Sequence, residues 1–256
     1  SGGKWAPDGK ASALDADEHD GYGAAVAIAG DRVFVGAPRQ DSLTGAVYVF
    51  HKDKDGSWTA DPKLRARGLE KRGRFGSVIV PSSNSEVLVG APGLAGGAGS
   101  VVILAADTNS HMWRETGRLM PFDGGPAAFG NAIAVDGNTV WVGAPAVNRA
   151  EGRVYQITRD STGAGIASRK LAPTGAAGGR LGFGGSIALA GGHGVIGQIA
   201  DAFGEGSAIP VTRGARGWAM GGKLEGEPRR LTASTGARVD CTNNSAKVFG
   251  CEGMDM

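Results

Sequence analysis

Short apolar segments alternate with polar turns along the chain, and the first clear set begins near residue 22. Gly30-Asp31 separates two apolar runs and is typical of a two-residue hairpin turn. Pro38 has no backbone N–H to donate, so it ends the second run. A polar loop and a charged tip separate two further runs. The pattern predicts four short antiparallel strands, over residues 24–29, 32–36, 46–50 and 58–64.

This four-strand pattern recurs at a nearly constant interval, which we call the repeat period. An aromatic residue followed by glycine begins each copy, at Tyr22, Phe75, Phe129 and Phe183. Gly-Ala-Pro follows the second apolar run, at residues 36–38, 90–92 and 143–145, and has decayed in the fourth copy at residues 197–199. A further glycine precedes the third run, at Gly45, Gly99, Gly152 and Gly206. Such a fixed period is the signature of a repeat architecture.

Tandem four-stranded antiparallel units of this length are typical of β-propeller blades, so we predict an all-β fold. A β-solenoid is disfavoured because its coils are shorter, and a sandwich would not repeat one four-strand unit in phase. Tryptophan recurs in the fourth strand, where blades diverge and more volume must be filled. Its positions are Trp58, Trp113 and Trp218, with Ile166 in the third copy.

Composition supports this interpretation. Glycine accounts for 46 of 256 residues, and 41% of the chain is hydrophobic against 20% charged. The hydrophobic content is too high for a disordered chain. The glycine content argues against long helices, because each interior glycine costs about 1 kcal/mol relative to alanine.

Charge and hydropathy exclude several partners. The net charge is +2, and no apolar run is long enough to span a bilayer. The densest basic run has no interleaved aromatic residues for base stacking, so we expect no nucleic-acid binding. Its members are Lys63, Arg65, Arg67, Lys71, Arg72 and Arg74.

The motif Phe75-Gly76 followed by residues 87–92 (Val-Leu-Val-Gly-Ala-Pro) resembles the FG-GAP repeat, and the resemblance covers about residues 1–225. FG-GAP repeats build propellers, typically of seven blades, in integrin α-chain heads and in many bacterial surface and secreted proteins. The spacing here is most similar to the bacterial kind. The resemblance implies binding of protein or glycan, usually without catalysis.

The repeat count leaves one further blade of which only the fourth strand is recognised. Trp5 lies as far before Tyr22 as Trp58 lies before Phe75, so residues 5–11 read as the fourth strand of a preceding blade. We predict that this strand closes the ring in a composite fifth blade, with at least one inner strand from residues 231–250. The propeller would then span residues 1–230, and residues 231–256 would form a tail that contributes to the last blade.

The tail holds both cysteines, Cys241 and Cys251. A regular hairpin turning at Asn243-Asn244 would separate them too far for a disulfide, which needs Cα atoms within about 7 Å. Either that hairpin is regular and the thiols are free, or the disulfide forms and the tail is irregular. The isolated pair favours the disulfide, and with it a location outside the cytoplasm.

A second resemblance supports the disulfide. Residues 241–256 are similar to the cysteine segment that introduces the choice-of-anchor B domain of bacterial surface proteins. This resemblance implies that the chain is the leading, N-terminal part of a larger envelope protein. The opening residues 1–4 show no signal peptide and fit either a processed N-terminus or a tag remnant.

One acidic segment has the spacing of a hard-cation loop. Asp15, Asp17 and Asp20 precede Gly21, which allows a sharp turn. FG-GAP domains often bind Ca²⁺ in such loops, so the resemblance favours a calcium site. The spacing departs from the usual loop pattern and no other repeat carries it, so a solvated loop between blades is the favoured alternative. No other cofactor is expected.

The loops between Gly-Ala-Pro and the third strand vary most in chemistry, which is typical of recognition loops on a constant scaffold. Their candidate contact residues are Arg39, Asp41, Asn148, Arg149, Glu151, Asp201 and Glu205. We therefore expect a non-enzymatic module in the periplasm or at the bacterial cell surface that engages another protein, such as a larger envelope complex. A lectin is the alternative, but only Phe203 offers an aromatic platform in these loops. No catalytic motif is present.

Overall fold

The structure is a computed structural model that describes residues 9–13, 15–68, 71–107, 110, 112–124, 127–173, 181–199, 206–215 and 217–224. The chain divides into two units, Ser1–Glu225 and Gly226–Met256, and all described residues lie in the first. Both cysteines, residues 231–250 and residues 5–8 therefore lie outside the described part, as do Asp201 and Glu205. Predictions that concern them, including the division at residue 230, stay predictions.

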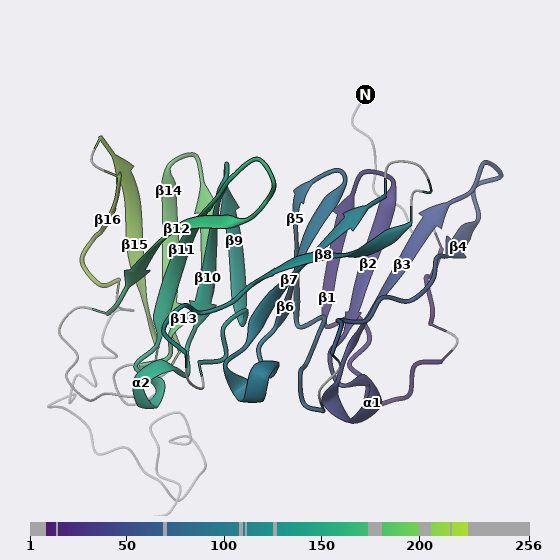
Figure 1. The fold of residues 1–256 in the computed structure, drawn as a ribbon, viewed down its shortest axis with the longest axis horizontal. Coiled ribbons are helices and arrows are strands. Elements are labelled where there is room, and N and C mark those ends of the chain that lie inside the picture. Colours follow the sequence, from purple (N-terminus) through teal and green to yellow (C-terminus); the bar gives the residue numbers. More distant parts are fainter. Residues whose placement is uncertain are drawn as a thin grey trace, which may run out of the picture. The chain divides into compact units, whose positions relative to one another are not determined.

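Four antiparallel four-stranded sheets make up the described fold, each built from four consecutive strands (Figure 1). This confirms the predicted all-β fold of four-stranded propeller blades, numbered here 1–4 in chain order. Blade 1 comprises β1 (Ala25–Ala29), β2 (Arg32–Ala37), β3 (Ala46–Lys52) and β4 (Trp58–Ala60). Blade 2 comprises β5 (Val78–Ser83), β6 (Glu86–Ala91), β7 (Ser100–Ala106) and β8 (Trp113–Leu119).

The other two blades repeat this order. Blade 3 comprises β9 (Ala132–Asp136), β10 (Thr139–Ala144), β11 (Arg153–Arg159) and β12 (Gly165–Leu171). Blade 4 comprises β13 (Phe183–Ala190), β14 (His193–Gln198), β15 (Ser207–Gly214) and β16 (Gly217–Met220). Three short helical turns join second to third strands: α1 (Gln40–Leu43), η1 (Ala95–Gly97) and α2 (Val147–Ala150).

The hairpin turns lie where the sequence predicted them. Ala29 pairs with Arg32 across Gly30-Asp31, and Gly30 has the left-handed φ of +60° that such a turn requires. Strand β2 ends at Ala37, directly before Pro38.

The outer strand of blade 1 is shorter than predicted. It ends at Ala60, and Leu64 returns to the sheet through an isolated bridge to Val47. Between them lies Pro62, which has no N–H for the ladder and interrupts the pairing. The predicted strand over residues 58–64 is therefore a three-residue strand, a break and one rejoining residue.

Alternate residues of each strand face the two neighbouring blades. We call the face toward the next blade in the chain the forward face, and the opposite one the backward face. Phe34 and Val49 of blade 1 share a buried cluster with Ile79 and Val87 of blade 2. Equivalent clusters join blade 2 to blade 3 and blade 3 to blade 4.

Tryptophans of the fourth strands enter two of these contacts. Trp113 packs edge-on against Phe34, with ring centroids 4.7 Å apart, and Trp218 packs likewise against Trp141 at 5.0 Å. Both pairs cross from one blade to the next, as the predicted position of the tryptophans requires.

The aromatic-glycine motif forms the backbone joint between blades. Phe75, Phe129 and Phe183 are fully buried. Each makes a parallel bridge to the glycine that precedes the third strand of the blade before it: Gly45, Gly99 and Gly152. A β-carbon on any of these three glycines would lie 2.1–2.2 Å from the phenylalanine carbonyl oxygen. The repeated glycines are therefore required by close backbone contact between blades.

Candidate functional site

The predicted recognition loops have an unusual backbone. Asp41, Ser42 and Leu43 have φ values of 50°, 60° and 68°, and residues 148–150 of blade 3 have 51°, 57° and 73°. Left-handed conformations cost non-glycine residues about 1–2 kcal/mol each. Such runs persist only where the surrounding structure holds them.

Hydrogen bonds to the next blade hold these turns. Arg74 N donates to Leu43 O at 2.7 Å, and Phe75 N donates to Thr44 O at 3.0 Å. In blade 3, Gly182 N and Phe183 N donate in the same way to Ala150 O and Glu151 O, at 2.7 and 3.0 Å. We call residues 39–45, 93–99 and 146–152 the latch loops, because their carbonyl groups fasten the next aromatic-glycine pair.

Most predicted contact residues of the latch loops point to solvent. Arg39, Asp41, Asn148 and Arg149 are exposed, whereas Glu151 is partly buried and accepts a hydrogen bond from Asn148 Nδ2. The structure thus combines a fixed loop backbone with side chains that differ from blade to blade.

The acidic segment contacts the first latch loop. Asp15 Oδ1 accepts a hydrogen bond from Tyr48 Oη at 2.8 Å, and Lys63 Nζ pairs with Asp15 Oδ2. Asp20 Oδ2 accepts from Asp17 N at 3.0 Å and from Gln40 Nε2 at 3.2 Å. Asp15 and Asp20 are thus occupied by protein donors. Among the described residues, no three acidic, histidine or cysteine side chains are grouped to hold a metal ion. Calcium binding here stays a prediction.

The same Tyr–Asp–Lys contact recurs two blades later. Tyr155 Oη donates to Asp123 Oδ1 at 2.7 Å, and Lys170 Nζ donates to Asp123 Oδ2 at 2.8 Å. Tyr155 and Lys170 lie two repeat periods after Tyr48 and Lys63. Sequence reasoning missed this set, although the shared repeat phase of the tyrosines and lysines is a signal that could have revealed it.

These contacts shift the pKa of both tyrosines and of both aspartates. Burial and the hydrogen bond to Asp15 raise the pKa of Tyr48 to about 12, and burial and Asp123 raise the pKa of Tyr155 further. The hydrogen bond from Lys63 lowers the pKa of Asp15. Burial opposes a lowered pKa at Asp123, but hydrogen bonds from Lys170 and Tyr155 outweigh it. Both carboxylates are therefore fixed in the charged form near neutral pH.

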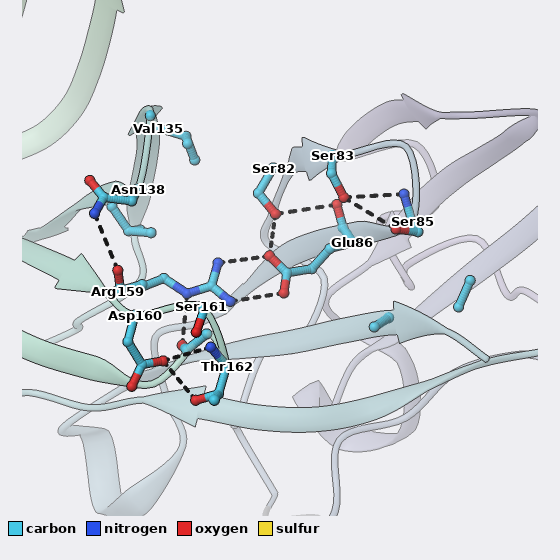
Figure 2. Close-up of a pocket in the computed structure, with 15 residues that line it drawn as sticks. Ser82, Ser83, Ser85, Glu86, Val135, Asn138, Arg159, Asp160, Ser161 and Thr162 are labelled. Atoms are coloured by element: carbon cyan, nitrogen blue, oxygen red, sulfur yellow. Dashed lines mark hydrogen bonds and ion pairs between the residues drawn. The ribbon is translucent and has the colours of Figure 1, made fainter. Parts of the chain in front are cut away.

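A polar hollow of about 350 Å³ lies between blades 2 and 3 at the hairpin turns (Figure 2). Arg159 and Glu86 lie at its centre and are joined by two hydrogen bonds of 2.7 and 2.8 Å. This pairing lowers the pKa of Glu86 and raises that of Arg159. Small polar side chains surround the pair: Ser82, Ser83, Ser85, Asn138, Asp160, Ser161 and Thr162.

The ion pair at the centre of the hollow joins two blades, and a related pair joins the next two. Arg213 lies one repeat period after Arg159, and its Nη1 is 3.1 Å from Asp136 Oδ2 of blade 3. The Arg159–Glu86 pair is thus a clamp between blades, and the hydroxyl groups around it are the part of the hollow available to a polar ligand.

Part of the basic run found in the sequence is bound by acceptors within the chain. Lys63 pairs with Asp15, Arg65 pairs with Asp41, and Arg67 donates to the backbone oxygen of Glu115 at 2.9 Å. Within the described residues, no helix is long and apolar enough to cross a membrane.

Comparison with known proteins supports a propeller-like repeat protein. Residues 5–50 match the model of the FG-GAP repeat family. That match covers the segment before the first repeat, β1, β2 and most of β3. FG-GAP repeats are associated with protein-interaction modules. The bacterial type and the choice-of-anchor B resemblance stay predictions.

Among solved structures, the chain is similar to Sqt1 of Saccharomyces cerevisiae, with a TM-score of 0.48 and 11% sequence identity. The similar region covers 81% of this chain and 64% of Sqt1, so the chain spans less than two thirds of that protein. No curated protein sequence matches this chain.

Proposed function

We propose that this protein is a non-enzymatic binding module that engages another protein outside the cytoplasm, in the periplasm or at a bacterial cell surface. The latch loops carry the proposal, because their backbone is fastened to the next blade while Arg39, Asp41, Asn148 and Arg149 are exposed. A loop that is already ordered loses little conformational entropy on binding. The module would serve as an accessory subunit of an envelope complex or as the front piece of a larger surface protein.

Alanine substitution of the loop side chains tests the proposal. The variant Arg39→Ala/Asp41→Ala/Asn148→Ala/Arg149→Ala leaves the left-handed backbone bonds in place but removes the exposed groups. Its control, Lys54→Ala/Ser110→Ala, changes exposed residues in the turns between third and fourth strands. Each protein is cross-linked in native envelope fractions, and bound proteins are quantified by mass spectrometry.

Bound proteins that the control retains and the fourfold variant loses would support recognition by the latch loops. Identical sets for the wild type and the fourfold variant would contradict it. Turnover by the purified protein on a broad panel of hydrolase substrates would contradict the non-enzymatic assignment.

A glycan-binding role is the second candidate, supported by the hydroxyl-rich hollow between blades 2 and 3. Its lining residues include no aromatic ring on which a sugar could stack. A glycan array probed with wild type and with Ser85→Ala/Asn138→Ala separates the two candidates. Binding that disappears in this variant would favour the lectin.

A further inference from the structure

The two ends of the blade series carry complementary halves of the same joint. Between blades, three contacts define the joint: the motif glycine of the later blade, an apolar residue three positions after it, and a large residue of the earlier blade. Each can be compared between the three formed joints and the two ends. The comparison concerns only described residues.

At blade 1, no described residue lies where a preceding blade would contact the motif glycine. Gly76, Gly130 and Gly184 have φ values of 86–93°, and a β-carbon on each would lie 2.6 Å from a carbonyl oxygen of the preceding blade. Gly23 has the same conformation, with φ of 89°, but a β-carbon there would have no described atom within 4 Å. Gly23 of blade 1 therefore has the backbone conformation of the formed joints, although no described blade packs against it.

The backward face of blade 1 is also uncovered near the motif. Ile79 and Ile133 lie three residues after their motif glycines and are 7% and 6% exposed. Val26 occupies the same position in blade 1 and is 68% exposed, and Ile28 beside it is 70% exposed. Farther out, Ala11 and Ala13 pack against this face with Tyr48 and Phe50.

At blade 4, the forward half of the joint is open. Phe34, Leu88 and Trp141 precede the glycine of their second strand by two residues, and all three are fully buried against the next blade. Val195 has the same position in blade 4 and is 38% exposed. It lines an apolar hollow of about 430 Å³ together with Ala188, Ala190 and Pro210.

The backbone of blade 4 is open in the same way. A β-carbon on Gly36, Gly90 or Gly143 would lie 2.0–2.2 Å from the motif glycine oxygen of the next blade. Gly197 is the equivalent glycine of blade 4, and the described atom nearest to a β-carbon there is Ser186 Oγ of the same blade. Gly206 is the blade 4 equivalent of Gly45, Gly99 and Gly152, and the nearest described atom there is Gln198 O, also of the same blade.

We propose that the forward face of blade 4 in one molecule receives the backward face of blade 1 in a second copy of the chain. Val26 and Ile28 would fill the hollow at Ala188, Ala190 and Val195, as Ile79 packs with Ala25 and Ala27 in the first joint. The three formed joints show that equivalent forward and backward faces pack together, and one chain carries one of each uncovered by described residues. Repeat arrays normally end in polar capping faces, which neither end has in the part of the chain that the structure describes.

Such an interface is heterologous, so it propagates from molecule to molecule or closes into a ring of copies. Charge placed on either face should therefore stop association, whereas charge placed elsewhere should not. Val26→Asp blocks one face and Val195→Asp blocks the other. Ile166→Asp is the matched control, because Ile166 is a 63% exposed apolar residue on β12, outside both faces.

Sedimentation velocity over a wide range of protein concentration gives the test. We expect the wild type and Ile166→Asp to associate as concentration rises, and Val26→Asp and Val195→Asp each to remain monomeric. Mixed together, the two monomeric variants should form a one-to-one dimer that grows no further, because each retains one intact face.

A wild type that stays monomeric at all concentrations would overturn the proposal, as would a mixture that forms no dimer. Closure of the two ends within one molecule, or their coverage by the rest of the chain, would give that monomeric result. Circular dichroism checks the fold of each variant. Val26→Lys and Val195→Lys, which place a charge at the same positions on a longer side chain, repeat the test if an aspartate variant unfolds.

Discussion

A β-carbon on Gly36 would lie 2.1 Å from the carbonyl oxygen of Gly76, so the glycine is required by the backbone of the next blade rather than by its own conformation. Gly36 has no left-handed φ, and an alanine there would be acceptable in an isolated strand. The same contact at Gly90 and Gly143 explains why the motif keeps glycine at this position in the first three repeats.

Gly36→Ala should therefore destabilise the protein strongly. The methyl group must push blades 1 and 2 apart, and overpacking of this kind costs about 1–3 kcal/mol or more. The matched control is Gly117→Ala in β8, where a β-carbon would meet only Ile103 Cδ1 at 3.5 Å. Urea unfolding of both variants measures the difference. Equal stability of the two would contradict the close-contact explanation.

The hydrogen bond from Tyr155 to Asp123 should contribute more to the stability of the protein than is usual for a bond near the surface. Tyr155 is 1% exposed, so Asp123→Ala leaves its hydroxyl group without the carboxylate acceptor, at a cost of about 1–3 kcal/mol. Tyr155→Phe in the Asp123→Ala background removes the orphaned hydroxyl and should recover part of the loss. A double-mutant cycle from urea unfolding measures the coupling. Additive effects would show that the bond contributes nothing.

The tyrosines should ionise at higher pH in the folded protein than in the unfolded chain. The chain has three tyrosines, and burial raises the pKa of Tyr22, Tyr48 and Tyr155. A raised folded pKa means that stability is complete below the unfolded value near 10 and declines as pH rises toward about 12, the pKa of Tyr48. The near-ultraviolet tyrosinate band should therefore appear at higher pH in the native protein than in urea. Coincident titration curves would refute the burial argument.

Acid should lower the stability of the folded protein, because folding lowers the pKa of carboxyl groups that are paired with basic side chains. The pKa of Glu86 is lowered by Arg159, and that of Asp15 by Lys63. Their contribution is complete above the unfolded values of about 4 and is lost as pH falls through the lower folded values. Glu86→Gln should flatten the fall of the melting temperature below pH 4 relative to wild type. An unchanged slope would mean that the Arg159 pair adds no pH-dependent stability.

Much of this fold could be predicted because each strand depends on local sequence signals. Gly30-Asp31 selects its hairpin turn and Pro38 ends its strand whatever the neighbouring blade does. The break after Ala60 was missed because the apolar pattern continues to Leu64 across Pro62. The left-handed run over residues 41–43 was also unpredictable, since the backbone donors that hold it belong to residues 72 and 74, at the entrance to the next blade.

The candidate site was predicted less well than the fold. The acidic residue Asp15 was singled out for its spacing from Asp17 and Asp20, but its structural partners are Tyr48 and Lys63, which no local pattern connects to it. Glu86 and Arg159 are far apart in the sequence and meet only because blades 2 and 3 are neighbours. The Glu86–Arg159 contact depends on the packing of the two blades, and the repeat period alone does not give it.

The N-terminal segment should contribute more stability than its position at a chain end suggests. Residues 9–11 are the described part of the strand predicted over residues 5–11. They belong to no strand in the described part of the chain, and the prediction for residues 5–8 stays a prediction. Ala11 and Ala13 nevertheless pack against the cluster that contains Tyr48 and Phe50, and Ala11 O accepts a hydrogen bond from Tyr22 Oη at 2.9 Å.

Deletion of residues 1–14 uncovers that cluster and removes Trp5, so the melting temperature should fall sharply or the protein should aggregate. Tyr22→Phe is the control, because it removes only the hydrogen bond to Ala11 and should cost about 1 kcal/mol. Differential scanning calorimetry of both variants compares the two losses. A deletion that costs no more than Tyr22→Phe would show that the segment is held by one hydrogen bond, and an unchanged melting temperature would rule out a role in closing the blade series.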